Sequence, residues 1–157
     1  EGELRSSVMR MKFHNRRENI DFYAAAMAAS GRDFLARVSP GMILPIPMHP
    51  RKRRERGFDQ CLLLARRFSE YSGIPLEEKN LRRIRYTRAQ KGLDAGARGD
   101  NVRDAFLLTH PERIREPVLL VDDIATTLAT IDSACRELNR RGFYDVWFMA
   151  LCTGRNG

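Results

Sequence analysis

The sequence lacks the features that mark a membrane, secreted or zinc-binding protein. No apolar run approaches membrane-spanning length, and no signal peptide is visible. The three cysteines lie far apart and form no CxxC pair, which argues against a zinc site and against a disulfide framework. We therefore expect buried, reduced thiols in a cytoplasmic protein.

Acidic residues are also few relative to basic ones. The 20 Asp and Glu residues face 28 Lys and Arg residues, which gives a formal net charge of +8. This balance favours anionic partners (phosphorylated metabolites, nucleic acid or an acidic surface) without choosing among them. With 157 residues, 43% hydrophobic content and no internal repeat, the chain is expected to fold as one domain over residues 1–157.

The most informative stretch runs from Pro117 to Thr130. Its four large apolar residues from Val118 to Val121 predict a strand over 117–123 that is covered on both faces, as in a parallel sheet. A helix over 128–141 is predicted next, because apolar residues recur there at helical spacing. Ligands of open α/β sheets bind where such a strand gives way to a helix.

The residues at this junction suit a phosphorylated sugar. Helix-start amides and the hydroxyls of Thr126 and Thr127 suit a phosphate, while Asp122 and Asp123 suit ribose hydroxyls or a hydrated metal ion. The alternative is a buried strand followed by an Asp-rich turn that caps a helix. That alternative accounts for the strand but not for the whole acid–acid–hydroxyl series.

A second group of charged residues follows a short predicted strand over 42–47. Five of the six residues from Arg51 to Arg56 are cationic, and we predict a loop there, bounded by Pro50 and Gly57. Such a loop is either a solvated basic surface or, next to a phosphate site, a clamp for pyrophosphate.

The remaining pattern completes an α/β fold with a central, mainly parallel sheet flanked by helices. Helices are predicted up to about residue 16, over 18–30 with a stop at Gly31, and over 60–71. Residues 76–84 are expected to be extended, 106–108 to form an edge strand, and 146–151 to form a last, buried strand. The basic stretch over 82–100 is either a mobile lid over an anionic ligand or a disordered segment without function.

The run from Val118 to Thr130 resembles the PRPP-binding motif of type I phosphoribosyltransferases: an apolar strand, two acids, two variable residues, then Thr-Thr-Gly-x-Thr. The resemblance implies that Asp122 and Asp123 hold the ribose hydroxyls of PRPP and contact its Mg²⁺ indirectly. The 5′-phosphate would be wrapped by residues Ala125, Thr126, Thr127, Leu128, Ala129 and Thr130. Leu128 replaces the glycine of the motif, and its Cβ disfavours a positive φ, so we expect altered phosphate binding.

Over most of its length the chain is similar to the ComF family of competence-associated proteins. The resemblance implies a type I phosphoribosyltransferase-like fold and a role in DNA uptake during natural transformation; the four-cysteine, zinc-binding amino-terminal segment of that family is not among these residues. The matching motifs are Pro45-Ile46-Pro47 with His49-Pro50-Arg51, Arg56-Gly57-Phe58-x-Gln60, Leu64-Ala65-Arg66, Arg83-x-Arg85-x-Thr87-x-x-Gln90, Arg98-x-x-Asn101-Val102-Arg103-x-Ala105-Phe106, and Val121 to Thr130.

Two functions follow from the resemblance. As an enzyme, the protein would displace pyrophosphate from C1 of PRPP, a reaction that needs charge stabilisation and exclusion of water. The pyrophosphate would be held by Arg51, Lys52, Arg53 and Arg56 and covered by a lid carrying Arg85, Arg88 and Lys91. No general base, and hence no catalytic residue, is assigned.

As a non-catalytic protein, it would bind a nucleotide or a DNA-processing partner on the same fold. The basic segments fit contacts to a phosphate backbone. Direct binding of nucleic acid is less favoured than a partner-protein role, because these segments carry just two aromatic residues for base stacking, Phe58 and Tyr86.

Overall fold

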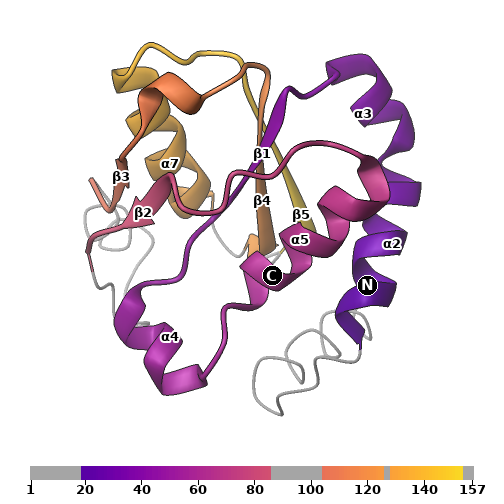
Figure 1. Cartoon of the computed structure of the whole chain (residues 1–157), viewed down its shortest axis with the longest axis horizontal. Helices are drawn as coiled ribbons and strands as arrows, with labels where there is room; N and C mark the ends of the chain where they lie inside the picture. The colour runs from indigo at the N-terminus through magenta and orange to yellow at the C-terminus, as the bar shows by residue number, and fades with distance from the viewer. Residues whose placement is uncertain (1–18, 86–103, 126–127, 154–157) are drawn as a thin grey trace.

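The computed structural model describes residues 19–85, 104–125 and 128–153. In this part of the chain three strands form a parallel sheet in the order β1–β4–β5, seen nearly edge-on in Figure 1. The strands are β1 (Met42–Pro45), β4 (Val118–Ala125) and β5 (Val146–Thr153). The predicted α/β class with a parallel sheet and flanking helices is therefore confirmed.

The central strand is β4, and all eight of its residues are buried. Val118 pairs with Met42 of β1 on one side and with Val146 of β5 on the other. A strand that is paired on both edges and covered on both faces needs apolar side chains on both faces. The consecutive apolar residues from Val118 to Val121 supply them. The strand extends two residues beyond the predicted end, and both acids lie inside it, as predicted.

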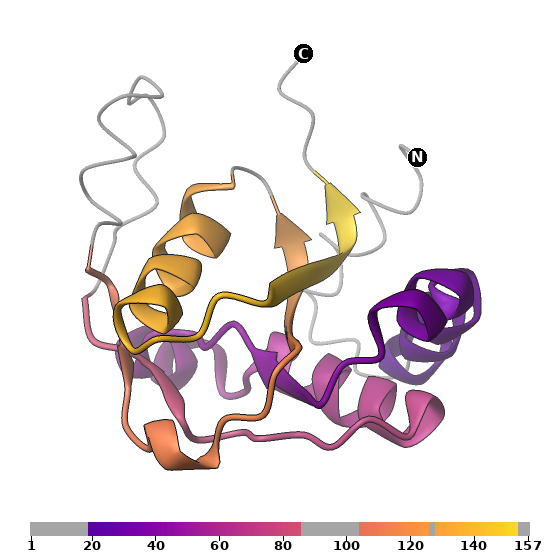
Figure 2. The same cartoon turned by 90° about the horizontal axis from the view of Figure 1, so that it is seen from above.

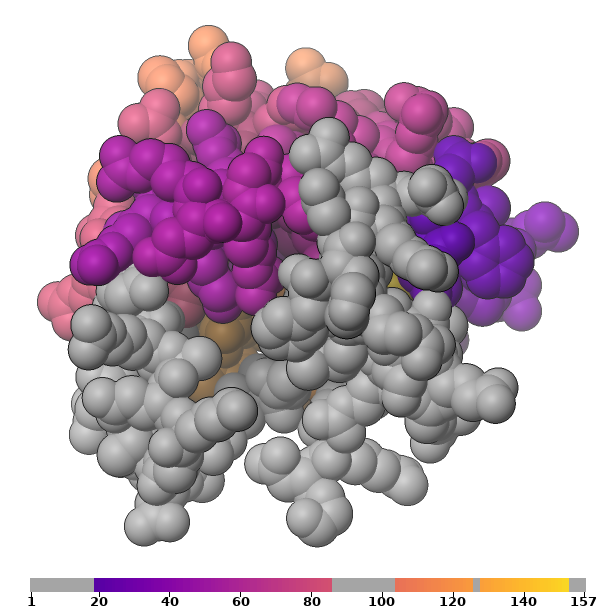
Figure 3. Space-filling view, turned by 90° about the horizontal axis from the view of Figure 1, so that it is seen from below, coloured from indigo at the N-terminus to yellow at the C-terminus, as the bar shows by residue number. Residues whose placement is uncertain are grey.

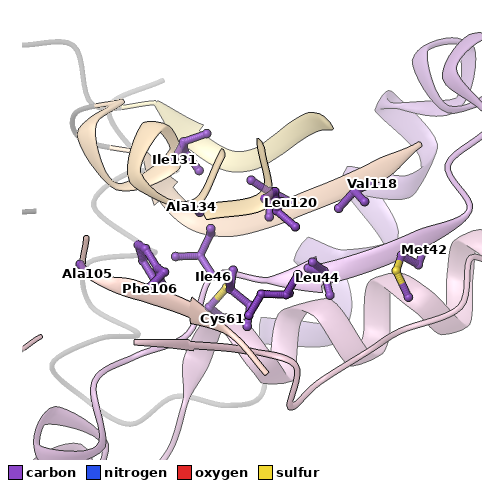
Figure 4. Packing of buried hydrophobic residues seen from close by; sticks show 13 residues of the cluster. Met42, Leu44, Ile46, Cys61, Ala105, Phe106, Val118, Leu120, Ile131 and Ala134 are labelled. Carbon is purple, nitrogen blue, oxygen red and sulfur yellow. The ribbon is translucent and has the colours of Figure 1, made fainter. Parts of the chain in front are cut away.

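Helices cover the two faces of the sheet (Figures 1 and 2). On one face lie α2 (Ile20–Ser30) and α5 (Gln60–Ser72), which share an apolar cluster with Leu119 and Val121. On the other lie α7 (Ala129–Arg140) and an antiparallel hairpin of β2 (Leu81–Arg83) and β3 (Phe106–Leu108). Residues of β1, β4, α7 and the hairpin form the second cluster, shown in Figure 4.

The hairpin is tied to the body of the protein by polar contacts. The backbone N–H of Leu108 in β3 donates to the buried carboxylate of Glu137 in α7 at 3.0 Å. The segment 76–84, which was predicted to be extended, contains β2 and, at Leu76, a single parallel bridge to Ile43 of β1. The predicted edge strand over 106–108 is confirmed as β3.

The segment from Arg51 to Arg56 is a helix, so the predicted loop was wrong. Helix α4 spans Pro50–Arg56. It begins with a proline at a position that needs no N–H donor, and the side chain of His49 accepts from the backbone N–H of Arg51 at 3.2 Å. It ends at Gly57, whose φ of 77° lies in the left-handed region and whose N–H donates to the carbonyl of Arg53. Both ends are therefore capped.

Two further corrections concern the amino-terminal helices and the last strand. The stop at Gly31 is followed directly by a helix that was not predicted, α3 (Arg32–Val38). Strand β5 was expected to be buried, yet Trp147 and Phe148 are 42% and 41% exposed. The reason is that β5 pairs with β4 along one edge, while its other edge has no partner among the described residues.

The described part of the chain also contains a short 3₁₀ helix, η2 (Pro111–Arg113). None of its helices has both the length and the apolar character that crossing a membrane requires. The helix predicted up to residue 16 lies outside the described residues.

Candidate functional site

The two adjacent acids lie at the carboxyl end of β4, where they are 8% and 7% exposed. Because side chains alternate along a strand, Asp122 lies on the same face as Val118 and Leu120, the face that the β2–β3 hairpin covers. One carboxylate oxygen of Asp122 accepts from the backbone N–H of Asp123, and one of Asp123 accepts from the N–H of Ile124, both at 2.8 Å. These bonds fix the orientation of both carboxylates.

Arg83, the last residue of β2, reaches the face of Asp122. Its guanidinium carbon lies 5.5 Å from the centroid of the Phe106 ring, in a cation–π arrangement. Burial lowers the pKa of Arg83, and the nearby charge of Asp122 acts in the opposite direction. The arginine therefore supplies positive charge beside one of the two acids. Arg83 belongs to one of the motifs named in the sequence analysis, but no role was predicted for it. Nothing in the sequence indicates that residue 83 lies near residue 122.

Cys61 lies beneath the acids at the start of α5. Its thiol donates to the carbonyl of Val121 at 3.0 Å. Burial, followed by the negative charges of Asp122, Asp123 and Asp59, holds the pKa of Cys61 well above its ordinary value. The side chain is therefore a neutral thiol that joins α5 to β4, and it has none of the thiolate character of a nucleophile.

Asp59 fixes the loop that leaves β1. As the cap of α5, its carboxylate accepts from the backbone N–H of Leu62 at 3.1 Å and from that of Met48 at 3.2 Å. The N–H of Ile46 donates to the carbonyl of Val121 at 2.8 Å. The segment between β1 and α4 thus runs beside the end of β4, which brings the basic helix to the same edge of the sheet as the two acids.

The next residue, Gln60, is a polar group that sequence reasoning missed. Its side chain is buried, with 1% of the residue exposed, yet neither its amide nitrogen nor its amide oxygen has a hydrogen-bond partner in the described part of the chain. A buried amide without a hydrogen-bond partner costs about 1–3 kcal/mol, so a bound water or a ligand is expected to satisfy it. Its signal in the sequence was its place in the Arg-Gly-Phe-x-Gln motif.

The cations of α4 do not all occupy the same position. Arg51 is exposed and lies 3.6 Å from the carboxylate of Glu55, whereas Lys52 and Arg56 are half-buried. Arg53 lines a groove between α4 and α5. Figure 3, which views the protein from the side of the carboxyl edge, shows α4 and the start of α5 at the surface.

Leu128 caps the amino terminus of α7 with φ of −67° and ψ of −6°. Since these angles lie in the right-handed region, leucine stands there without the strain that a positive φ would impose. Its carbonyl accepts from the N–H of Asp132 at 2.7 Å, and its side chain is 60% exposed. Ala129 and Thr130 lie half-buried in the first turn of α7.

The other predicted site residues are placed in part. Arg85 lies just after β2 and is exposed. Thr126, Thr127, Arg88 and Lys91 lie outside the described residues. Within the described residues, no group of three or more His, Cys, Asp or Glu side chains is arranged to hold a metal ion.

Comparison with known proteins gives relatives but no family model that matches the chain. Competence protein F of Haemophilus influenzae is 32% identical over 115 residues, which cover 71% of this chain and 50% of that protein. DNA utilization protein YhgH of Salmonella typhi is 32% identical over 152 residues, which cover 92% of this chain and 65% of that protein. The chain therefore spans about half to two thirds of the length of these curated relatives.

Proposed function

Because these relatives support the assignment of this chain to the ComF family, which its motifs resemble, we propose that it is a phosphoribosyltransferase-like protein that binds PRPP with Mg²⁺. The names of the relatives point to a function in competence or DNA utilization. The type I phosphoribosyltransferase-like form of the α/β fold and a cytoplasmic location are parts of the same proposal.

The observation that carries the proposal is the placement of Asp122 and Asp123. Two neighbouring acids are buried at the carboxyl end of the central parallel strand, and the helix α7 begins at residue 129. Burying carboxylates is costly, so a pair kept at the ligand-binding edge of an α/β sheet calls for a function. Vicinal ribose hydroxyls can donate to two adjacent carboxylates.

The other residues are assigned from the resemblance to the PRPP-binding motif and, where the structure describes them, from their place near this pair. The first turn of α7, with Leu128, Ala129 and Thr130, and the preceding residues Ala125, Thr126 and Thr127 would bind the 5′-phosphate, because amides at a helix start attract anions. Arg51, Lys52, Arg53 and Arg56 would neutralise the pyrophosphate, and Arg85, Arg88 and Lys91 would cover it. Bound Mg²⁺ would supply charge neutralisation of the diphosphate.

A non-catalytic form of the same site is the second candidate. It is favoured by Leu128, an exposed apolar side chain at the position where the related motif has glycine. On this alternative, the protein binds PRPP or a nucleotide without turnover, or contacts a DNA-processing partner.

The proposal is tested by thermal unfolding with and without PRPP and Mg²⁺. At a ligand concentration of about one hundred times Kd the native state gains about 2.7 kcal/mol, a rise of roughly 5 °C or more in Tm. The double variant Asp122→Asn, Asp123→Asn is expected to lose this rise. The matched control is Asp33→Asn, which removes an exposed acid from α3 and is expected to keep it. An unchanged Tm of the natural chain in excess PRPP would refute the site.

A further inference from the structure

A groove of about 440 Å³ lies between α4 and α5, and the PRPP proposal accounts for one of its lining residues, Arg53, but not for the others. Its walls and floor include Arg53 and Arg54 of α4, Phe58 of the connecting segment, and Leu62, Leu63 and Arg66 of α5. The buried side of α5, with Cys61 and Leu64, faces the sheet instead. The groove is therefore an outward-facing feature of α5.

The walls of the groove carry an excess of positive charge. Arg53 and Arg54 are exposed and have no ion-pair partner among the described residues. Arg66 is already compensated, because its guanidinium donates to both carboxylate oxygens of Glu78 at 2.6 and 2.8 Å. The carboxylate of Asp59 also lines the groove, but its oxygens accept from backbone N–H groups. Helix α4 as a whole carries five cations and one acid.

The floor of the groove is aliphatic. Leu62 and Leu63 are half-buried, and Leu63 packs against the first apolar cluster. Leu62 belongs to neither apolar cluster, although the helix brings it to the surface beside the arginines. An apolar strip between two helices, bordered by cations, matches an amphipathic segment whose apolar side chains enter the groove and whose acidic side chains meet the arginines.

We propose that this α4–α5 groove docks an acidic, amphipathic segment of a partner protein. Nucleic acid fits less well, because binding of single strands relies on exposed aromatic rings for base stacking, and the one ring of the groove, Phe58, is 9% exposed. A small metabolite also fits the groove less well, because such a ligand is mostly enclosed in its site, whereas Arg54 is exposed and Leu62 and Leu63 are only half-buried.

Substitutions at two residues test the docking surface without changing the proposed PRPP site. Arg54 and Leu62 line the groove and have no part in the proposed binding of PRPP. Arg54→Glu reverses a charge on the wall, and Leu62→Ser removes an apolar contact from the floor. Arg37→Glu, on an exposed position of α3, is the matched control for the same charge reversal elsewhere.

The probe is a fluorescent acidic peptide that carries two leucines one helical turn apart, with fluorescence anisotropy as the readout. Arg54→Glu is expected to weaken binding about tenfold and Leu62→Ser about fivefold, while Arg37→Glu changes it by less than about twofold. A second peptide with serine in place of both leucines is expected to bind at least about fivefold more weakly than the first. The Tm rise with PRPP is measured on every variant and is expected to persist, which also shows that each variant is folded.

Three results would overturn the docking proposal. One is no binding of the acidic peptide at low salt. Another is an equal loss of peptide affinity in Arg37→Glu and Arg54→Glu, which would indicate attraction to the overall charge of the protein and not to the groove. The third is a single-stranded oligonucleotide that displaces the peptide and depends on Arg54 but not on Leu62, which assigns the groove to nucleic acid. Failure of the PRPP site would appear instead as an absent Tm rise in the natural chain.

Discussion

Strand β4 and helix α4 lie toward the same edge of the protein and are held there in opposite ways. All eight residues of β4 are buried, whereas no residue of α4 is. The strand carries two adjacent acids into the interior, and the helix holds five cations at the surface. The position of β4 therefore depends on packing and sheet pairing, whereas α4 has no fully buried residue and is capped at both ends.

Because of this difference, charged groups cost the fold more free energy in β4 than on α4. Buried carboxylates lose hydration, and the backbone N–H groups of Asp123 and Ile124 together with the charge of Arg83 offset part of that loss. Exposed arginines keep their hydration, so their number and order on α4 cost the fold little. We expect substitutions in β4 to change stability and ligand binding together, and substitutions on α4 to change binding alone.

The largest effect is expected from Leu120→Ala in β4. Leu120 is fully buried between β1 and α7, so truncation leaves a cavity and is expected to lower the free energy of unfolding by about 2–5 kcal/mol, measured by urea denaturation. Leu128→Ala, which shortens an exposed leucine just beyond the same strand, is the control and is expected to change it by less than about 0.5 kcal/mol. Equal effects would show that burial does not determine the stability of β4.

The second effect concerns Cys61, which joins α5 to the end of β4. Its pKa is raised in the folded protein, so the neutral thiol stabilises the fold fully below its ordinary pKa near 9. Above that pH the thiol of the unfolded chain ionises while the folded one does not. Its contribution to stability is then lost by up to about 1.4 kcal/mol per pH unit.

Urea denaturation across pH 8 to 10, in steps of about half a unit, measures this loss. Cys61→Ser keeps a donor for the carbonyl of Val121 without ionising in this range, so it is expected to reduce the decline. Cys135→Ser is the comparison: burial also raises the pKa of this thiol, but it is only half-buried, so a smaller reduction is expected. If the free energy of unfolding declined equally in the natural chain, Cys61→Ser and Cys135→Ser, ionisation of Cys61 would not be the cause of the decline.

The contrast between the two elements also explains what the sequence could predict. The apolar run in β4 and the period of α7 allowed both elements to be placed within about two residues, because burial leaves a direct trace in composition. The helix α4 was missed because none of its seven residues is fully buried, and its capping by His49 and Gly57 depends on local geometry. The role of Arg83 was not predicted for a different reason: its neighbour Asp122 comes from a distant part of the chain, and one sequence does not give that proximity.

The smallest effect is expected from His49→Ala at the start of α4. Loss of the acceptor for the N–H of Arg51 removes a cap worth about 1 kcal/mol, so hydrogen exchange of the amides of α4 is expected to rise about fivefold. The free energy of global unfolding is expected to change by less than about 0.5 kcal/mol, because no residue of α4 is buried and fraying of the helix exposes no core. His49→Asn, which restores a good cap, is expected to restore slow exchange. A matching loss of global stability would contradict this independence, since it would mean that α4 is held by packing, as β4 is.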